Sequence, residues 1–109
     1  MQIGDIVYLY TIDLMSVLAI KQSLIPNRFC KVIDMKVVKG GTEKEQYIEY
    51  KAVSLLGDTT YTFNNYLSPY QYCYIETVEK TIDELKPNLL EDKFEDMQYL
   101  IKKIKEIIK

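Results

Sequence analysis

The spacing of apolar residues changes along the chain, from a short period over most of its length to a helical period at the end. Between Ile3 and Val78, β-branched and aromatic residues gather in short runs that partly alternate with polar ones. Such runs are typical of β-strands, in which successive side chains point to opposite faces of a sheet. From Asn88 to Lys109 the apolar residues recur every three or four positions. That period is helical, so we expect a strand-rich body followed by a C-terminal helix.

The predicted C-terminal helix carries one apolar seam. A capping box at Thr81–Glu84 predicts a short helical turn before the C-terminal helix. Asn88 is the predicted N-cap of the C-terminal helix. The helix would span about 30 Å, whereas the strands of a small barrel are about 20 Å long. The seam could cover the body of the same chain, but its excess length predicts a second partner. It consists of Leu90, Phe94, Met97, Ile101, Ile104 and Ile108, spaced as in a short coiled coil.

The charges of this helix are sorted by sign. Its first half is acidic, and its second half carries Lys102, Lys103, Lys105 and Lys109. In an antiparallel pair, the acidic half of one helix faces the basic half of the other, whereas a parallel pair places like charges together. If the protein forms a homodimer through this helix, we therefore expect an antiparallel pair.

Five segments before this helix have the composition of strands, separated by short turn-forming segments. Gly40–Lys44 and Gly57–Asp58 are the predicted hairpin turns. Asp13–Ser23 is ambiguous, because Asp13 could cap a short helix and the stretch could equally form a strand. Short strands with short connections predict an α+β fold that is mainly β, an antiparallel sheet curled into a small barrel. The predicted strands are Ile3–Ile12, Arg28–Lys39, Gln46–Leu56, Thr59–Phe63 and Tyr70–Val78.

The opening residues Ile3-Gly4-Asp5-Ile6-Val7-Tyr8 are similar to the start of many small SH3-like barrel proteins, whose first strand begins with a Gly-Asp-x-Val element. A long hairpin over Arg28–Leu56, a tight turn and short final strands resemble that architecture too. The resemblance implies a five-stranded SH3-like barrel over residues 1–78 and a helical extension over residues 79–109. It does not imply one function, since such barrels serve peptide binding, RNA binding and scaffolding.

The composition limits which catalytic and metal-binding groups the chain can provide. The 109 residues include no histidine, which removes the commonest general base and the commonest transition-metal ligand. Carboxylate pairs such as Asp83 with Glu84 have no accompanying base, metal-ligand set or phosphate-binding loop. We therefore expect a protein that is not an enzyme and uses no cofactor or metal. Cys30 and Cys73 are expected to be reduced and buried, with a disulfide between them as the alternative.

The same sequence favours a cytoplasmic protein that does not enter a membrane. The N-terminus lacks the basic region of a signal peptide, and no uncharged apolar run approaches the ~20 residues that cross a bilayer. The formal net charge of −2 argues against a protein that mainly neutralises phosphates. Abundant Ile, Lys and Tyr, whose codons are AT-rich, indicate a low-GC bacterium or one of its phages.

Tyrosines alternate along the last predicted strand. Tyr70, Tyr72 and Tyr74 share one face, and Tyr66 lies nearby in the sequence. One interpretation is an aromatic face that binds a peptide or stacked bases. The other is a bed on which the C-terminal helix packs. Residues 57–79 contain no Lys or Arg, which disfavours a nucleic-acid site there.

An acidic tract extends from Glu76 to Asp96, with eight acids and three lysines. It is either a solvated helix face or a surface that occupies a basic groove on a protein partner. Small acidic phage proteins that inhibit host defence systems, such as anti-CRISPR proteins, look like this in outline. The leading hypothesis is therefore a protein-interaction module that binds a partner with a basic surface, and such an inhibitor is one form of it. The residues predicted for this surface are Glu84, Glu91, Asp92, Glu95 and Asp96.

Two other functions stay open at this stage. Basic residues in the first half of the chain would suit an RNA- or DNA-binding barrel, although a strand edge kept soluble by lysine is the favoured interpretation. A structural accessory subunit is the third possibility. The basic residues concerned are Lys21, Arg28, Lys31, Lys36 and Lys39.

Overall fold

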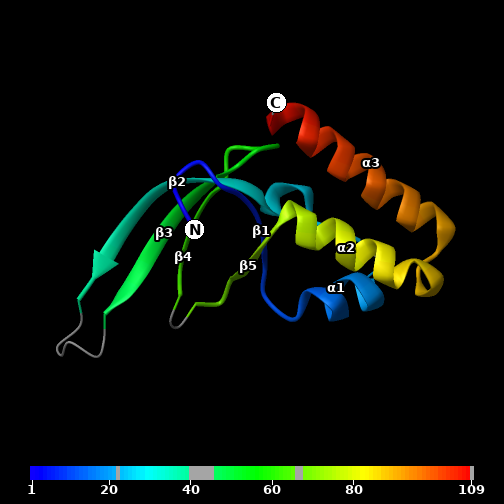
Figure 1. The fold of residues 1–109 in the computed structure, drawn as a ribbon, viewed down its shortest axis with the longest axis horizontal. Helices are drawn as coiled ribbons and strands as arrows, with labels where there is room; N and C mark the ends of the chain where they lie inside the picture. Colours follow the sequence, from blue (N-terminus) through cyan, green and yellow to red (C-terminus); the bar gives the residue numbers. More distant parts are fainter. Residues whose placement is uncertain (22, 40–45, 66–67, 109) are drawn as a thin grey trace.

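The computed structural model describes residues 1–21, 23–39, 46–65 and 68–108, which form one five-stranded sheet and three α-helices (Figure 1). The helices lie together at one side of the sheet, and the β2–β3 hairpin extends away from them. The strands are β1 Ile6–Tyr10, β2 Phe29–Val38, β3 Tyr47–Ser54, β4 Thr60–Asn64 and β5 Gln71–Tyr74. The helices are α1 Leu14–Lys21, α2 Ile75–Leu85 and α3 Glu91–Ile108, with short 3₁₀ turns at Pro26–Arg28 and Lys86–Asn88.

The sheet confirms the α+β class, but the barrel is not closed. The strand order is β4-β3-β2-β1-β5, and every neighbouring pair is antiparallel. With five strands in such a series, the two edge strands β4 and β5 run in the same direction. A closing ladder would have to be parallel, and parallel pairs are less stable per residue. The edge strands therefore meet through side chains alone, and the closed barrel predicted from the sequence is wrong.

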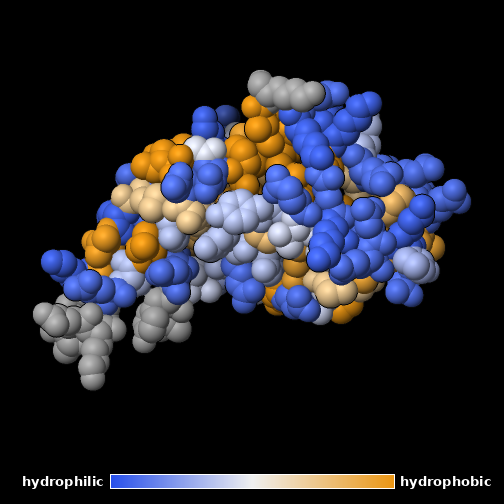
Figure 2. All heavy atoms as spheres, viewed as in Figure 1, coloured by the Kyte–Doolittle hydropathy of each residue, from blue (hydrophilic) through white to orange (hydrophobic). Residues whose placement is uncertain are grey.

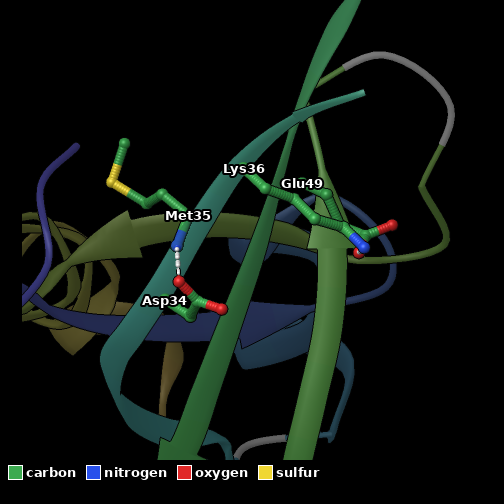
Figure 3. Close-up of polar contacts among 4 residues, drawn as sticks. All are labelled: Asp34, Met35, Lys36 and Glu49. Carbon is green, nitrogen blue, oxygen red and sulfur yellow. Dashed lines mark hydrogen bonds and ion pairs between the residues drawn. The ribbon is translucent and has the colours of Figure 1, made fainter. Parts of the chain in front are cut away.

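A β-bulge in β2 decides which residues face each side of the sheet. The register shifts between Val32 and Asp34, which leaves Ile33 without a partner in β3. Cys30 and Val32 therefore share a face with Met35, which strict alternation along the strand would place on the opposite face. Beyond the bulge, the Asp34 carboxylate accepts a hydrogen bond from the Met35 N–H at 2.9 Å (Figure 3).

One face of the sheet is covered by the three helices. Tyr8 of β1 and Phe29 of β2 lie opposite each other, with ring centroids 4.7 Å apart. Side chains from all three helices complete this cluster, which we call the helix-side core. Its buried members are Tyr8, Leu14, Leu18, Leu24, Phe29, Ile75, Val78, Ile82, Leu85, Leu89, Phe94, Met97, Ile101 and Ile104.

The other face of the sheet is concave and has its own cluster, which we call the concave-side core. It takes residues from β1 to β4, with partly buried side chains from β5 and the N-terminus packed against it. No helix contributes to it. Its buried members are Val7, Leu9, Cys30, Val32, Tyr50, Ala52 and Phe63.

Helix α2 is longer and earlier than expected. The last strand was predicted to run to Val78, but β5 ends at Tyr74 and α2 follows at once. Ile75, Val78, Ile82 and Leu85 recur at spacings of 3, 4 and 3, and all four are buried. Thr81 lies inside the helix, where its hydroxyl donates to the Thr77 carbonyl at 2.8 Å, so it does not cap a later turn. A domain boundary after residue 78 would therefore cut this helix.

Helix α3 confirms a long C-terminal helix but not the whole predicted seam. The helix begins at Glu91, and Asn88 belongs to the preceding 3₁₀ turn instead of capping it. Phe94, Met97, Ile101 and Ile104 are buried in the helix-side core. The two ends of the seam are not, because Leu90 and Ile108 are 59% and 44% exposed. Helix α2 supplies the surface that the predicted barrel was too short to provide.

The segment left open between helix and strand is the helix α1. Asp13 caps it, since its carboxylate accepts hydrogen bonds from the Met15 N–H and the Ser16 hydroxyl, both at 3.3 Å. Gly4 forms the turn before β1 with a φ of +98°, a conformation that favours glycine. The predicted Gly57–Asp58 two-residue turn is wrong, because residues 55–59 connect β3 to β4. The predicted Gly40–Lys44 loop lies outside the described residues.

Candidate functional site

Aromatic rings fill the gap where the edge strands β4 and β5 face each other. Tyr50 of β3 contacts Phe63 of β4 and Tyr72 of β5, with ring centroids 5.3 and 6.3 Å apart. Phe63 and Tyr72 contact each other across the gap at 5.9 Å. Edge-to-face and offset ring pairs at such distances are favourable. We call this line of contact between β4 and β5 the tyrosine seam.

At one end of the tyrosine seam, the guanidinium of Arg28 lies over two tyrosine rings. Tyr61 of β4 and Tyr70, just before β5, have ring centroids 5.5 Å apart in an edge-to-face arrangement. The Arg28 Cζ lies 5.5 Å from the Tyr61 ring centroid and 4.9 Å from that of Tyr70. Both distances are within the range of cation–π attraction. Within the described residues, the Arg28 side chain forms neither a hydrogen bond nor an ion pair.

A depression of about 360 Å³ lies beside the same end of the seam. Tyr70 belongs to both features, since it lines the depression and stacks with Arg28. The described residues of the lining contribute aromatic, amide and hydroxyl groups and no carboxylate or ammonium group. The lining residues are Tyr10, Asn64, Asn65, Ser68, Tyr70, Gln71 and Tyr72.

Three of the four predicted aromatic-face residues can be placed. Tyr70 and Tyr72 are half-buried in the seam, and Tyr74 is 39% exposed with its ring 6.4 Å from that of Tyr72. Tyr66 lies outside the described residues. The alternative bed for the C-terminal helix is wrong, because Cys73 is the β5 residue that packs against the helix-side core.

Sequence reasoning missed the cross-strand members of this seam. Tyr50 and Phe63 come from different strands and lie opposite each other in the β3–β4 ladder. Arg28 was grouped with the lysines of the first half of the chain. One sequence feature could have separated it, because it is the only arginine in a chain with thirteen lysines. Arg stacks on aromatic rings and pairs with carboxylates in ways that Lys does not.

The predicted acidic surface is present at one end of the α2–α3 hairpin. All five of its residues are exposed, and they come from the last turn of α2 and the first turns of α3. Within the described part of the chain, ion pairs join Lys36 to Glu49 and Lys105 to Glu79, and none involves this surface. Figure 2 shows hydrophilic residues over most of the α2–α3 hairpin in that view. We call Asp83 and the five predicted residues Glu84, Glu91, Asp92, Glu95 and Asp96 the acidic tip.

Helix dipoles favour only two of the six carboxylates of the acidic tip. Glu91 and Asp92 lie in the first turn of α3, where a negative charge is favoured by the helix dipole. Asp83 and Glu84 lie at the C-terminal end of α2, whose last turn has no basic residue. Carboxylates there oppose the dipole and lower helix stability. The dipole of α2 therefore does not account for their presence.

The basic residues of the first half do not form one patch. Lys36 pairs with Glu49 across the β2–β3 ladder, with an N–O distance of 3.2 Å (Figure 3). Lys51 lies opposite Asp34 in the same ladder. Arg28 lies on the concave side with Tyr61 and Tyr70, away from the helix-side face. Among the predicted basic residues, Lys36 is matched by a neighbouring acid, whereas Arg28 has no ion pair in the described structure.

The two thiols are free and unreactive by environment. Cys30 is buried in the concave-side core and Cys73 packs against the helix-side core. Burial raises the pKa of both thiols to about 12, so neither is a thiolate near neutral pH. Within the described ranges, no group of three or more Cys, Asp or Glu side chains is placed to hold a metal ion.

Comparisons with protein-family models, with curated proteins and with solved structures found no match. No helix among the described residues is long and apolar enough to cross a membrane.

Proposed function

We propose that this chain is a non-enzymatic protein-binding module whose acidic tip docks on a basic surface of a partner protein. The proposal is carried by the position of Asp83 and Glu84, whose exposed carboxylates oppose the dipole of α2 and have no cation within ion-pair distance in the described structure. Groups that cost stability and lie exposed together are more often retained for binding than for folding.

The shape of the tip supports a protein partner. A helical hairpin places carboxylates from two helices on one end, joined by the short turn Lys86–Asn88. Complementary charge of this kind speeds association and selects partners by their surface potential. An inhibitor that fills the basic groove of a nucleic-acid-binding host protein is one form that this function takes. The free thiols fit a cytoplasmic setting, which we include in the proposal.

An RNA- or DNA-binding role gains nothing from the arrangement of charges. A phosphate-binding surface needs several unpaired cations on one face. Here Lys36 is paired with Glu49, and Lys51 lies opposite Asp34 in the β2–β3 ladder.

The test is a comparison of two neutralised variants with equal net charge. The tip variant carries Glu84→Gln, Asp92→Asn and Glu95→Gln. The control variant carries Asp58→Asn, Glu76→Gln and Glu106→Gln, which also remove three exposed carboxylates. Each protein is immobilised and exposed to a lysate of a low-GC bacterium at about 0.05 M and about 0.3 M salt, since screening weakens exposed charge contacts.

Support requires one or more basic proteins that bind the wild type and the control variant, are lost with the tip variant, and are released by the higher salt. Equal capture by both variants contradicts the proposal, and so does salt-insensitive capture. Failure to retain any basic protein at low salt counts against it as well.

A further inference from the structure

We propose that Arg28, Tyr61 and Tyr70 recognise a carboxylate on an extended polypeptide segment that lies along the tyrosine seam. This is a second binding site, separate from the acidic tip and resting on different observations. The site brings together a guanidinium without an ion pair among the described residues, two strands that each have an edge without a partner in the described chain, and an adjoining depression.

The Arg28 guanidinium contacts two rings, but its N–H groups remain available to an acceptor as far as the described residues show. The Arg28 Cζ lies within 5.5 Å of both ring centroids and the residue is half-buried, so the position of the guanidinium is restricted. Its N–H groups have no acceptor among the described residues. A guanidinium edge presents N–H donors in a fork that matches a carboxylate. A guanidinium restricted in this way, with no acceptor among the described residues, is suited to bind a carboxylate.

The choice of residue supports the same reading. Every other cation of the chain is a lysine, and the single arginine stands where two tyrosines flank it. A solubilising charge would not need Arg, whereas stacking combined with two-pronged recognition of a carboxylate does.

The strands beside the cluster suit an extended polypeptide. β4 and β5 are the edge strands, so each has one backbone edge without a strand partner in the described chain. Extended peptides bind such edges by adding main-chain hydrogen bonds, and neighbouring pockets take alternate side chains. The depression along Tyr70, Gln71 and Tyr72 provides one such pocket.

A carboxylate fits this site better than a phosphate chain. The depression has no ammonium group in its lining, and Arg28 is the one cation that contacts the seam tyrosines in the described structure. One guanidinium matches a single carboxylate, whereas a nucleic acid needs several cations along its backbone.

The experiment uses the full chain and two libraries of random octapeptides, one with free C-terminal carboxylates and one amidated. Binding is followed by selection on immobilised protein and then by titration of ¹⁵N-labelled protein with the selected peptides. We expect Asp or Glu at a fixed position in both libraries if a side chain supplies the carboxylate. Enrichment only in the free-carboxylate library would assign the carboxylate to the C-terminus. In either case amide shifts should map to Tyr61 and Tyr70–Tyr72.

Variants of Arg28 decide the matter. Arg28→Gln should weaken the selected peptides at least about tenfold, and Arg28→Lys should recover only part of that loss because lysine lacks the planar fork. Replacing the peptide Asp or Glu by its amide should cost as much in the wild type and nothing more in Arg28→Gln. The melting temperature of each variant controls for folding.

Several results would overturn the proposal: no selected peptides, peptides without a required carboxylate, or affinity that Arg28→Gln leaves unchanged. Arg28-dependent binding of an oligothymidylate without binding of acidic peptides would also reject it, in favour of a phosphate site. The tip variant Glu84→Gln, Asp92→Asn, Glu95→Gln should bind the peptides like the wild type. Failure of this site therefore leaves the acidic-tip function standing, and the reverse also holds.

Discussion

The two faces of the sheet bury their apolar side chains in different ways. On one face, three helices supply mostly aliphatic side chains, and together they close the helix-side core around Tyr8 and Phe29. On the other face, the sheet curls over its own concave-side core, and the last gap is bridged by rings from β4 and β5 without a ladder. Both faces bury apolar surface, but only the first is covered by further secondary structure.

The difference separates the part that holds the fold from the part that is open to a partner. On the helix-covered face, pockets lie beside Ile82 and Ile101 and beside Met97 and Leu100, not along a strand edge. A curled sheet with an odd number of antiparallel strands ends on two open edges that run in the same direction. The aromatic rings and Arg28 stand at that opening. Binding to the tyrosine seam should therefore be separable from stability.

The largest expected effect is on the helix-side core. Ile82 of α2 is 1% exposed, and Ile82→Ala should lower the free energy of unfolding by about 2–5 kcal/mol, through lost transfer energy and the cavity left behind. Urea unfolding with an unchanged m-value measures it. Val37→Ala on the exposed hairpin is the control, with an expected change within about 0.5 kcal/mol. Similar losses for both would mean that the helices do not form a tight core.

Raising the pH tests whether the cysteine thiols on both faces of the sheet are shielded from water. The folded pKa of each thiol is raised from 9.0 to about 12, so above pH 9 only the unfolded chain releases these protons. The contribution of the two buried thiols to the free energy of unfolding is then full below pH 9, and it falls as the pH rises from about 9 towards 12. Between pH 8 and pH 10 the loss should be about 1.4 kcal/mol for each thiol. Denaturant titrations across this range measure it.

Single replacements assign that loss to the two faces. Cys30→Ala should remove the contribution of the concave-side core, and Cys73→Ala that of the helix side. If Cys30→Ala leaves the pH slope unchanged, then water reaches the concave side in the folded protein.

The concave side should respond less to a change of shape. Phe63→Leu keeps an apolar side chain but removes the ring contacts with Tyr50 and Tyr72, so we expect a loss of about 1 kcal/mol. Thermal unfolding and denaturant titration both measure it. A loss as large as that of Ile82→Ala would show that the seam is as tightly packed as the helix-side core.

The smallest effects distinguish the acidic tip from both cores. Asp83→Asn with Glu84→Gln should raise stability by about 0.3–1 kcal/mol at low salt, because these carboxylates oppose the dipole of α2. The matched pair Glu91→Gln with Asp92→Asn should lower stability by a similar amount, since α3 begins there. Both changes should shrink as salt is added. Equal signs for the two pairs would contradict the dipole argument.

The sequence predicted the strands and the final helix because each of those elements follows a local period. It predicted only a short helical turn at the end of α2, although Ile75, Val78, Ile82 and Leu85 have helical spacing. The tyrosines before them continued a strand pattern into the helix. The bulge between Val32 and Asp34 is set by pairing with β3, so it leaves no clear period in the chain.

The candidate sites were predictable to different degrees. The acidic tip was found almost complete, because its residues are close in sequence and exposure follows from charge. The tyrosine seam was found in part: Tyr70 and Tyr72 were predicted, but Arg28 reaches them only through the curl of the sheet. Similarly, the predicted six-residue helix seam looked long enough to need a second chain. In the structure, its four central residues pack in the helix-side core with residues of α2.

Amide hydrogen exchange tests the contrast between the two faces most directly. Measured by NMR on the full chain, the amides of β1, which is paired on both sides, should exchange only through global unfolding. Amides on the outer edges of β4 and β5 should exchange through local openings of much lower free energy, while those of β4 bonded to β3 stay protected. If the outer-edge amides of β4 and β5 are as protected as β1, the strands are paired across the seam. The sheet would then be a closed barrel with no edge to offer a partner.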